Sequence, residues 1–149
     1  MKKEVADKII VNTDGGSRGN PGAAAIGAVI TGIGKEIKEY SEFIGIKTNN
    51  EAEYQAIIFA LKKVRQLAGR ENLEKTGVEV RTDSELVARQ LKGEYKVEEK
   101  NLQPLFMEIW NLRFDFPHLA LKEVPREENQ KADRLVNSCL DQQNSKLFK

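Results

Sequence analysis

The sequence has one cysteine, Cys139, and one histidine, His118, among 149 residues. A single thiol cannot form an intramolecular disulfide, and it rules out a metal site built on a Cys-x-x-Cys motif. A single histidine likewise rules out a histidine-rich metal centre. Any metal ion would therefore have to be bound by oxygen ligands.

Long apolar runs are also missing. No stretch approaches the roughly 18 apolar residues that a transmembrane helix needs. Residues 1–8 are charged and lack the apolar segment of a signal peptide. We therefore expect a soluble, cytoplasmic protein that makes no contact with a membrane.

An excess of charge of either sign is absent as well. The 24 basic and 23 acidic residues leave a formal net charge of +1. This balance rules out a polybasic or acidic tail, so nucleic acid could be bound only through a local basic patch. Charged residues make up 32% of the chain, which predicts a heavily charged surface.

The hydrophobic fraction is 40%, which is typical of a globular protein and excludes global disorder. A chain of this length buries roughly 68–70% of the surface that its unfolded form exposes, so it can form a core without metal or disulfide staples. We expect one domain over residues 1–149, with a core at about 8–142 and tails at 1–7 and 143–149. We also expect it to act as a monomer.

The spacing of apolar residues changes along the chain from the period of strands to that of helices. Strands are predicted at 8–13, 23–31, about 37–46, 77–82 and 118–124, and helices at 49–68, 85–92, about 102–114 and 127–142. The first three strands form an antiparallel meander, and the later strand–helix–strand units require parallel neighbours. The predicted fold is α/β, a mixed five-stranded sheet with helices on its faces.

Four carboxylates occupy unusual positions in this pattern. Asp14 and Asp83 each end a predicted strand, where open α/β sheets bind ligands. Glu53 and Asp133 each lie near the start of a helix, on its predicted core-facing stripe. Taken singly, each has an ordinary structural explanation: a turn aspartate for Asp14, helix capping for Asp83, and a solvent-facing position for the two helical acids.

Together, these four carboxylates would repel one another strongly at one end of the sheet. A cation must balance them, and oxygen ligands suit Mg²⁺ or Mn²⁺. Two ions about 3.5–4 Å apart can bind the attacking water and the leaving oxygen of a phosphodiester. The residues therefore favour a two-metal phosphodiester hydrolysis site.

At these residues the sequence resembles type 1 ribonuclease H, over about residues 8–142. The matching motifs are TDGGSRGNPG at 13–22, TNNEAE at 48–53, TDS at 82–84, and VPREEN at 124–129 leading to Ala132-Asp133. The resemblance implies the ribonuclease H-like fold. It also implies catalytic metal ligands at Asp14, Glu53, Asp83 and Asp133, with two Mg²⁺ ions per site that Mn²⁺ can replace.

The resemblance further implies an endoribonuclease that hydrolyses the RNA strand of RNA–DNA hybrids and leaves 5′-phosphate and 3′-hydroxyl ends. Gly15, Asn20 and Asn50 would contact 2′-hydroxyls, the groups that distinguish RNA from DNA. Thr48 and Asn49 resemble a pocket for a DNA-strand phosphate. A helix N-terminus there would offer N–H groups to this phosphate, although Thr48 also fits a plain capping role.

Basic residues near the first turn and the short helix are the candidates for further phosphate contacts. Arg18 lies four residues after Asp14 in the predicted turn, and Lys92 and Lys96 flank the short helix and its loop. Ordinary solvated charges are the alternative interpretation for all three.

The sequence departs from the family pattern at several points. The loop before Asp133 lacks the histidine that many members carry, and Arg126 or Glu127 could take its place in product release. Glu85 stands where the family has a glutamine that helps to read the RNA strand. The basic, Trp-bearing protrusion after the short helix is absent. His118 is interpreted as structural, and Trp110 as a core residue.

Two other functions remain open at this point. One is a nuclease of the same fold that acts on DNA or on double-stranded RNA, against which Asn20 and Asn50 favour a hybrid reader. The other is a non-catalytic module that binds hybrids, against which the intact set of four acids argues.

Overall fold

The computed structural model describes residues 4–147 of the chain. Its strands are β1 Val5–Gly19, β2 Gly22–Ile33, β3 Lys38–Lys47, β4 Gly77–Thr82 and β5 Leu119–Glu123. Its α-helices are α1 Asn49–Ala68, α2 Arg70–Leu73, α3 Glu85–Leu91, α4 Gln103–Leu112 and α5 Gln130–Leu147, and the 3-10 helices are η1 Arg113–Asp115 and η2 Arg126–Glu128.

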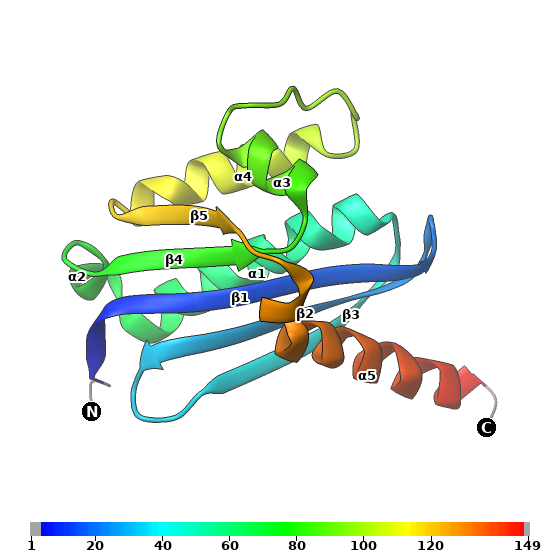
Figure 1. The fold of residues 1–149 in the computed structure, drawn as a ribbon, viewed down its shortest axis with the longest axis horizontal. Coiled ribbons are helices and arrows are strands. Elements are labelled where there is room, and N and C mark those ends of the chain that lie inside the picture. Colours follow the sequence, from blue (N-terminus) through cyan, green and yellow to red (C-terminus); the bar gives the residue numbers. More distant parts are fainter. Residues whose placement is uncertain (1–3, 148–149) are drawn as a thin grey trace.

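The five strands form one mixed sheet in the order β3-β2-β1-β4-β5 (Figure 1). β1 pairs antiparallel with β2, and β2 antiparallel with β3, so the first three strands form the expected meander. β4 is parallel to both β1 and β5. The mixed five-stranded sheet predicted from the sequence is therefore confirmed.

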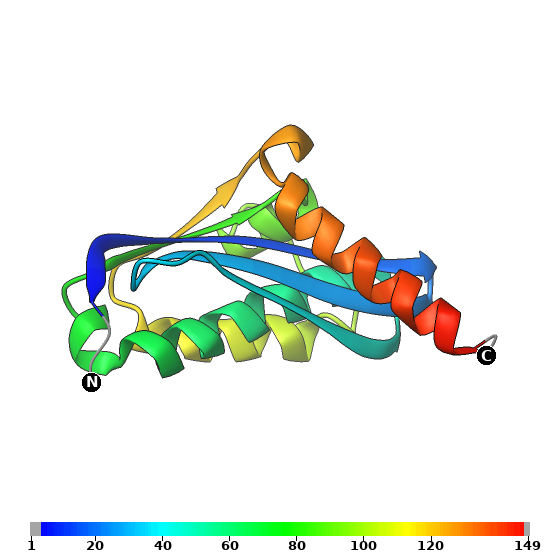
Figure 2. The same ribbon diagram turned by 90° about the horizontal axis from the view of Figure 1, so that it is seen from below.

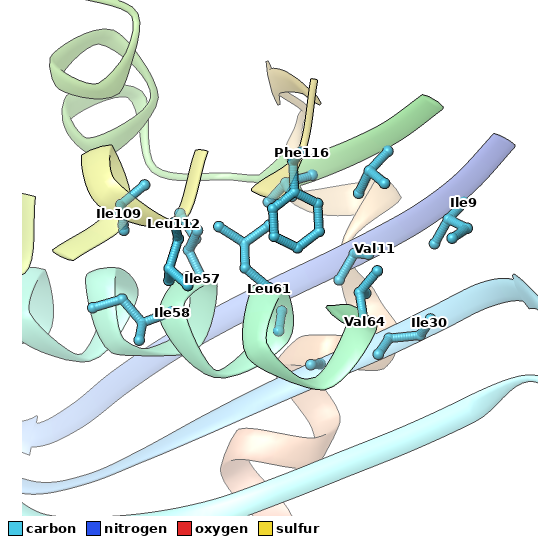
Figure 3. Close-up of a cluster of buried hydrophobic side chains, with 14 of the residues drawn as sticks. Ile9, Val11, Ile30, Ile57, Ile58, Leu61, Val64, Ile109, Leu112 and Phe116 are labelled. Carbon is cyan, nitrogen blue, oxygen red and sulfur yellow. The ribbon is translucent and has the colours of Figure 1, made fainter. Parts of the chain in front are cut away.

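Helices cover the two faces of the sheet unequally. α1 packs on β1 and β2 and also contacts α4, whereas α5 crosses the opposite face over β1, β2 and β3 (Figure 2). The main core lies between the sheet and the α1 layer (Figure 3). It includes Val11, Ile57, Leu61 and Val64, all fully buried. A smaller cluster of Ala25, Val136 and Leu140 holds α5.

The start of α1 has a complete capping box. The Thr48 hydroxyl accepts a hydrogen bond from the Glu51 N–H at 3.1 Å, and the Glu51 carboxylate accepts one from the Thr48 N–H at 2.9 Å. These two bonds satisfy N–H groups that the helix itself cannot pair. They fix the position at which the chain leaves β3 and turns towards Glu53.

The largest difference from the predicted elements concerns β1. It does not end at residue 13 but continues to Gly19 and pairs with β2 without a break from Ile10 to Gly19, so the turn is confined to Asn20 and Pro21. Gly15, one of the glycines that suggest a turn, lies instead within the strand and allows a close approach of α1. A Cβ on Gly15 would lie 2.2 Å from the Ala52 carbonyl carbon of α1.

Several other boundaries differ from the prediction. The predicted last helix at 127–142 is split into η2 and α5, and α5 extends past 142. β1 begins at Val5, inside the predicted N-terminal tail. Trp110 is not a core residue: it is 46% exposed and stacks on Phe106, since it lies on the outer side of α4.

No helix within residues 4–147 has the length and apolar character needed to cross a bilayer.

His118 lies just before β5, where its Nε2 is 2.9 Å from the Glu74 carbonyl oxygen, in keeping with a structural role.

Candidate active site

The register of the parallel strands brings Asp14 and Asp83 together. The last residues paired between β1 and β4 are Asn12 and Arg81, and each aspartate lies two residues beyond this pair. Both carboxylates therefore lie at the carboxyl end of the parallel ladder, where ligands bind in open sheets. Asp14 is buried within β1 and Asp83 is half-buried at the start of α3.

Glu53 enters the same place from the first turns of α1. Its Oε1 accepts a hydrogen bond from the Gly15 N–H at 3.2 Å, and its Oε2 accepts one from the Thr82 hydroxyl at 3.2 Å. The side chain is 8% exposed. Glu53 is thus held between β1 and β4 by one donor from each strand.

One carboxylate oxygen from each of Asp14, Glu53 and Asp83 lies within 4.8 Å of the other two. No Lys or Arg side chain in residues 4–147 forms an ion pair with any of the three. Three acids without a cation at this distance oppose one another's ionisation.

The pKa values of the buried acids reflect this crowding. Burial raises the pKa of Asp14 to about 7, and the nearby Asp83 and Asp133 carboxylates add to the rise. Burial and the Asp14 carboxylate also hold the pKa of Glu53 well above its usual range, although the Gly15 N–H acts in the opposite direction. The site is therefore built to attract positive charge.

Asp133 approaches from α5, on the other face of the sheet. Its side chain is exposed, and it interacts with the Asp14 carboxyl group at the rim of the cluster. The prediction that Asp133 lies on the core-facing stripe of its helix is wrong. That stripe is formed by Ala132, Val136 and Leu140, and Asp133 lies beside it.

A bridge between β1 and the start of α5 sets where Asp133 lies. The buried Asn129 side chain donates to the Thr13 carbonyl oxygen at 2.9 Å and accepts from the Asn12 amide at 3.1 Å. The Asn129 carbonyl oxygen accepts from the Asp133 N–H at 3.1 Å. One residue therefore contacts both the strand that carries Asp14 and the helix turn that carries Asp133.

The chemistry of this donor set fits a divalent cation. All candidate ligands are carboxylate oxygens, which suit Mg²⁺ and Mn²⁺. The raised pKa values mean that a cation would replace protons that the metal-free cluster would otherwise hold. Asp14, Glu53 and Asp83 are the residues that can share an ion, with Asp133 at the edge.

The residues predicted to contact the substrate fall mostly around the N-terminus of α1. The Asn20 side-chain oxygen accepts from the Asn49 N–H at 3.0 Å, and the Asn49 side-chain oxygen accepts from the Ser17 N–H at 2.9 Å. The Asn50 amide donates to Glu99 at 3.3 Å. The tip of the β1–β2 hairpin is thus fastened to the start of the helix.

This arrangement qualifies the expected phosphate pocket. The N–H groups of Asn49, Glu51 and Ala52 already have protein acceptors. Most donors of the helix N-terminus are therefore satisfied within the protein, and a phosphate would depend more on the side chains of Thr48 and Asn49. The Gly15 N–H is likewise committed to Glu53.

Arg18 is not part of that group. Its guanidinium lies 2.6 Å from Asp141 on α5 and 3.4 Å from the Asn137 carbonyl oxygen. Arg126 and Glu127 are exposed in η2, the segment that leads into α5. Glu85, at the family's glutamine position, pairs with Arg89 at 3.2 Å and accepts from the Tyr95 hydroxyl at 3.1 Å.

Thr82 and Asn129 belong to the sequence motifs, but the motifs alone do not indicate a role for either residue. Each is a buried polar residue placed shortly before a candidate acid, which is the only local signal for them. Their partners, Glu53 and Thr13, are distant in sequence. Only the folded arrangement identifies them as supports of the cluster.

The sequence matches the family described as Reverse transcriptase-like over residues 12–139. It is 38% identical to ribonuclease HI of Halobacterium salinarum over 129 residues, which is 86% of this chain and 62% of that protein. It is 37% identical over 136 residues to the bifunctional protein Rv2228c of Mycobacterium tuberculosis, covering 90% of this chain but 36% of that one. The chain thus spans about a third of the length of the mycobacterial relative.

Solved structures give the same class. LC11-RNase H1, isolated from compost, superposes with a TM-score of 0.83 at 45% identity, covering 91% of this chain and 97% of that one. RNase H1 of Halobacterium salinarum superposes with a TM-score of 0.81 at 35% identity, covering 91% and 98%. Fold and sequence place the protein in the ribonuclease H-like class. Within this class, the chain belongs to the type 1 ribonuclease H family.

Proposed function

We propose that the protein is a metal-dependent endoribonuclease that hydrolyses the RNA strand of RNA–DNA hybrids. The observation that carries this proposal is the cluster of Asp14, Glu53 and Asp83, whose carboxylate oxygens lie within 4.8 Å of one another without a protein cation. Family membership supports the same chemistry. LC11-RNase H1, 46% identical to this chain, has been crystallised in complex with an RNA/DNA hybrid.

The catalytic residues of this proposal are Asp14, Glu53, Asp83 and Asp133, which would hold two Mg²⁺ ions or, in their place, Mn²⁺. Bound ions would activate the attacking water and stabilise the leaving 3′-oxygen, giving 5′-phosphate and 3′-hydroxyl ends. The chain's own contribution is to hold the four carboxylates in place. Glu53 is fixed by Gly15 and Thr82, and Asp133 by the first turn of α5.

Recognition of the RNA strand is assigned to the hairpin tip and the start of α1. The Asn20 and Asn50 side chains lie at or beside the N-terminus of α1, the helix that carries Glu53. A 2′-hydroxyl can both donate to and accept from an amide. Thr48 and Asn49 would contact a phosphate of the DNA strand. Arg18 would add a phosphate contact, and Arg126 or Glu127 would assist product release from the loop before Asp133.

The remaining parts of the proposal concern the protein's setting. A net charge of +1 and the lack of a basic protrusion fit a protein with few phosphate contacts. We place the protein in the cytoplasm and treat it as one domain that acts as a monomer. Sedimentation at several protein concentrations tests the last point.

The experiment that tests the activity uses end-labelled RNA–DNA, RNA–RNA and DNA–DNA duplexes of one sequence, with Mg²⁺, with Mn²⁺ and with EDTA. We expect internal cleavage of the RNA strand of the hybrid only, and only with metal. The Asp83→Asn variant serves as the matched control, because it removes one carboxylate and keeps the side chain's shape. Binding of the hybrid without metal-dependent cleavage would refute the proposed enzymatic activity and favour a binding module. Preferential cleavage of the DNA–DNA or RNA–RNA duplex would refute the proposal that the substrate is an RNA–DNA hybrid.

A further inference from the structure

Asn129 is a buried side chain that the proposed chemistry does not use. It is 1% exposed and lies between η2 and α5, and within residues 4–147 its side chain bonds to Asn12 and Thr13 but to none of the cluster carboxylates. A buried amide is retained without cost only if its donors and acceptor are paired. The hydrogen-bond partners of the Asn129 side chain indicate its role.

The side chain joins two segments that each carry a candidate metal ligand. Its Nδ2 donates to the Thr13 carbonyl oxygen at 2.9 Å, immediately before Asp14. Thr13 lies just past the last residues paired between β1 and β4, and its hydroxyl donates to the Arg81 carbonyl oxygen at 3.0 Å. The Asn129 amide thus supplies a bond to β1 at a point beyond the parallel ladder.

The backbone of the same residue starts the helix that carries Asp133. The Asn129 carbonyl oxygen accepts from the Asp133 N–H at 3.1 Å, and its own N–H donates to the Arg126 carbonyl oxygen at 3.0 Å. Asp133 is the one candidate ligand that comes from the opposite face of the sheet and is exposed. It therefore needs a tether more than Glu53, which is buried and has two donors of its own.

We propose that Asn129 is a positioning residue that sets the place of Asp133 relative to Asp14 and thereby the metal affinity of the cluster. This inference rests on the proposed metal site but not on the identity of the substrate. Residues that orient a metal ligand without touching the metal typically contribute about 10–100-fold to metal affinity or activity.

The test measures Mn²⁺ binding without substrate, from the electron paramagnetic resonance signal of the unbound ion. We expect Asn129→Ala to weaken binding by about tenfold. Asn137→Ala is the matched control: its side-chain amide donates to the Asp133 carbonyl oxygen at 3.1 Å and forms no bond to β1 within residues 4–147. The Asn137 carbonyl oxygen that Arg18 of β1 contacts stays in the variant, so binding should remain near wild type. Val64→Ala, in the core away from the cluster, controls for a general loss of stability.

A double-mutant cycle decides whether Asn129 acts through Asp133. In an Asp133→Asn background, Asn129→Ala should weaken Mn²⁺ binding by less than about twofold, since the ligand that it positions is already altered. An equal loss in both backgrounds would overturn the proposal, as would unchanged binding in the single variant or no Mn²⁺ binding by the wild type. Asn129→Ser, which keeps a hydroxyl for Asn12, replaces the alanine variant if that variant does not fold.

The outcomes also separate this inference from the proposed function. If the wild type cleaves hybrids but Asn129→Ala binds Mn²⁺ as tightly as the wild type, the inference about Asn129 alone is refuted. If Asn129→Ala binds Mn²⁺ more weakly but the wild type hydrolyses no duplex, the proposed function alone is refuted. A rise in the Mg²⁺ concentration for half-maximal activity, rescued at high Mg²⁺, is expected if both hold.

Discussion

The Thr82 hydroxyl links Glu53 to the start of α3: it donates to the Glu53 carboxylate at 3.2 Å and accepts from the Ser84 N–H at 3.1 Å. Thr82 is the last residue of β4 and is 1% exposed. Because Asp83 lies between the two ends of this link, one hydroxyl fixes the spacing of two candidate metal ligands. Removing one partner of such a bond leaves a buried polar group unsatisfied, which lowers the stability of the folded protein.

Replacing this hydroxyl by a methyl group tests the link. We expect Thr82→Val to lower the free energy of unfolding by about 1–3 kcal/mol, because buried polar groups lose their partner. We also expect a rise in the Mg²⁺ concentration needed for half-maximal cleavage. Thr31→Val is the control, since the Thr31 hydroxyl bonds to the Ile10 carbonyl oxygen, at 3.4 Å, and to none of the candidate acids within residues 4–147. An equal rise in Mg²⁺ requirement in both variants would contradict the specific role of Thr82.

Two adjacent glycines in β1 should respond differently to a methyl group. A Cβ on Gly15 would lie 2.2 Å from the Ala52 carbonyl carbon and 2.6 Å from the Glu53 nitrogen, both backbone atoms of α1. A Cβ on Gly16 would lie 3.6 Å from the nearest heavy atom, in the Val136 side chain, which is an ordinary contact.

We therefore expect Gly15→Ala to lower the free energy of unfolding by about 1–3 kcal/mol or more, as overpacking does. The variant should also lose activity, because α1 and Glu53 would move away from β1. Gly16→Ala should change the stability little. Chemical denaturation and cleavage assays on the two purified variants measure both effects. The prediction fails if Gly15→Ala melts and cleaves like Gly16→Ala.

The raised pKa of Asp14 predicts how the stability of the metal-free protein depends on pH. The pKa rises from 3.8 to about 7 on folding, so the folded state keeps a proton that the unfolded state releases. The resulting stabilisation is complete below about pH 4 and is lost as the pH rises to about 7. The pKa of Glu53 is also raised and acts in the same direction.

The measurement compares the wild type with Asp14→Asn, in EDTA, by denaturant unfolding from pH 4 to pH 8. The free energy of unfolding of the wild type should fall relative to that of the variant across this window. Added Mg²⁺ should restore the stability of the wild type at pH 7 and above, because a cation favours the ionised carboxylates. If the difference in the free energy of unfolding between the two proteins does not change with pH, the cluster does not oppose the ionisation of Asp14.

Much of the candidate site can be predicted from the sequence, because its signals are local or periodic. The alternation of strands and helices predicts a meander joined to parallel strands, and the parallel β1–β4 pair of the structure brings Asp14 and Asp83 together. The features that the sequence does not predict depend on contacts between distant segments. The glycines after Asp14 suggest a turn, but the need for space is set by α1, which packs against Gly15.

The misplaced side chains have the same origin. Asp133 lies one position to the side of the buried stripe of α5, and helical spacing alone does not resolve that rotation. The apolar neighbours of Trp110 predict a core position, yet the side chain is exposed on α4. The ion pair of Arg18 with Asp141 also depends on how α5 packs and has no signal in the sequence, whereas the phosphate contact of Arg18 stays a prediction.

The burial of the four acids predicts a ranking of their importance. Glu53 is buried and held by two donors, whereas Asp133 is exposed at the rim. We expect Glu53→Gln to reduce turnover by more than about 100-fold, beyond the usual effect of residues that only support a ligand. Asp133→Asn should have a milder effect that high Mn²⁺ partly restores. Turnover measured over a range of Mg²⁺ and Mn²⁺ concentrations tests the order, and equal losses in the two variants would refute it.

Substrate binding should depend only weakly on salt, because few phosphates can be neutralised by a chain of net charge +1. Each neutralised duplex phosphate contributes about 0.9 to the slope of log K against log salt, so two or three contacts predict a slope of about −2 to −3. A slope that corresponds to about six contacts or more would reveal a basic surface that net charge does not indicate.

Arg18 provides the sharpest form of this test, because its guanidinium already has a partner in Asp141, 2.6 Å away. If Arg18 contacts a phosphate, Asp141 competes with the substrate for it. We expect Arg18→Ala to raise KM with little change in kcat, as loss of uniform binding does, and Asp141→Asn to lower KM and steepen the salt slope. Arg113→Ala is the control, since η1 precedes β5 and lies at the end of the sheet away from the acids. If Asp141→Asn instead raises KM as Arg18→Ala does, the ion pair holds α5 in place and Arg18 is not a substrate contact.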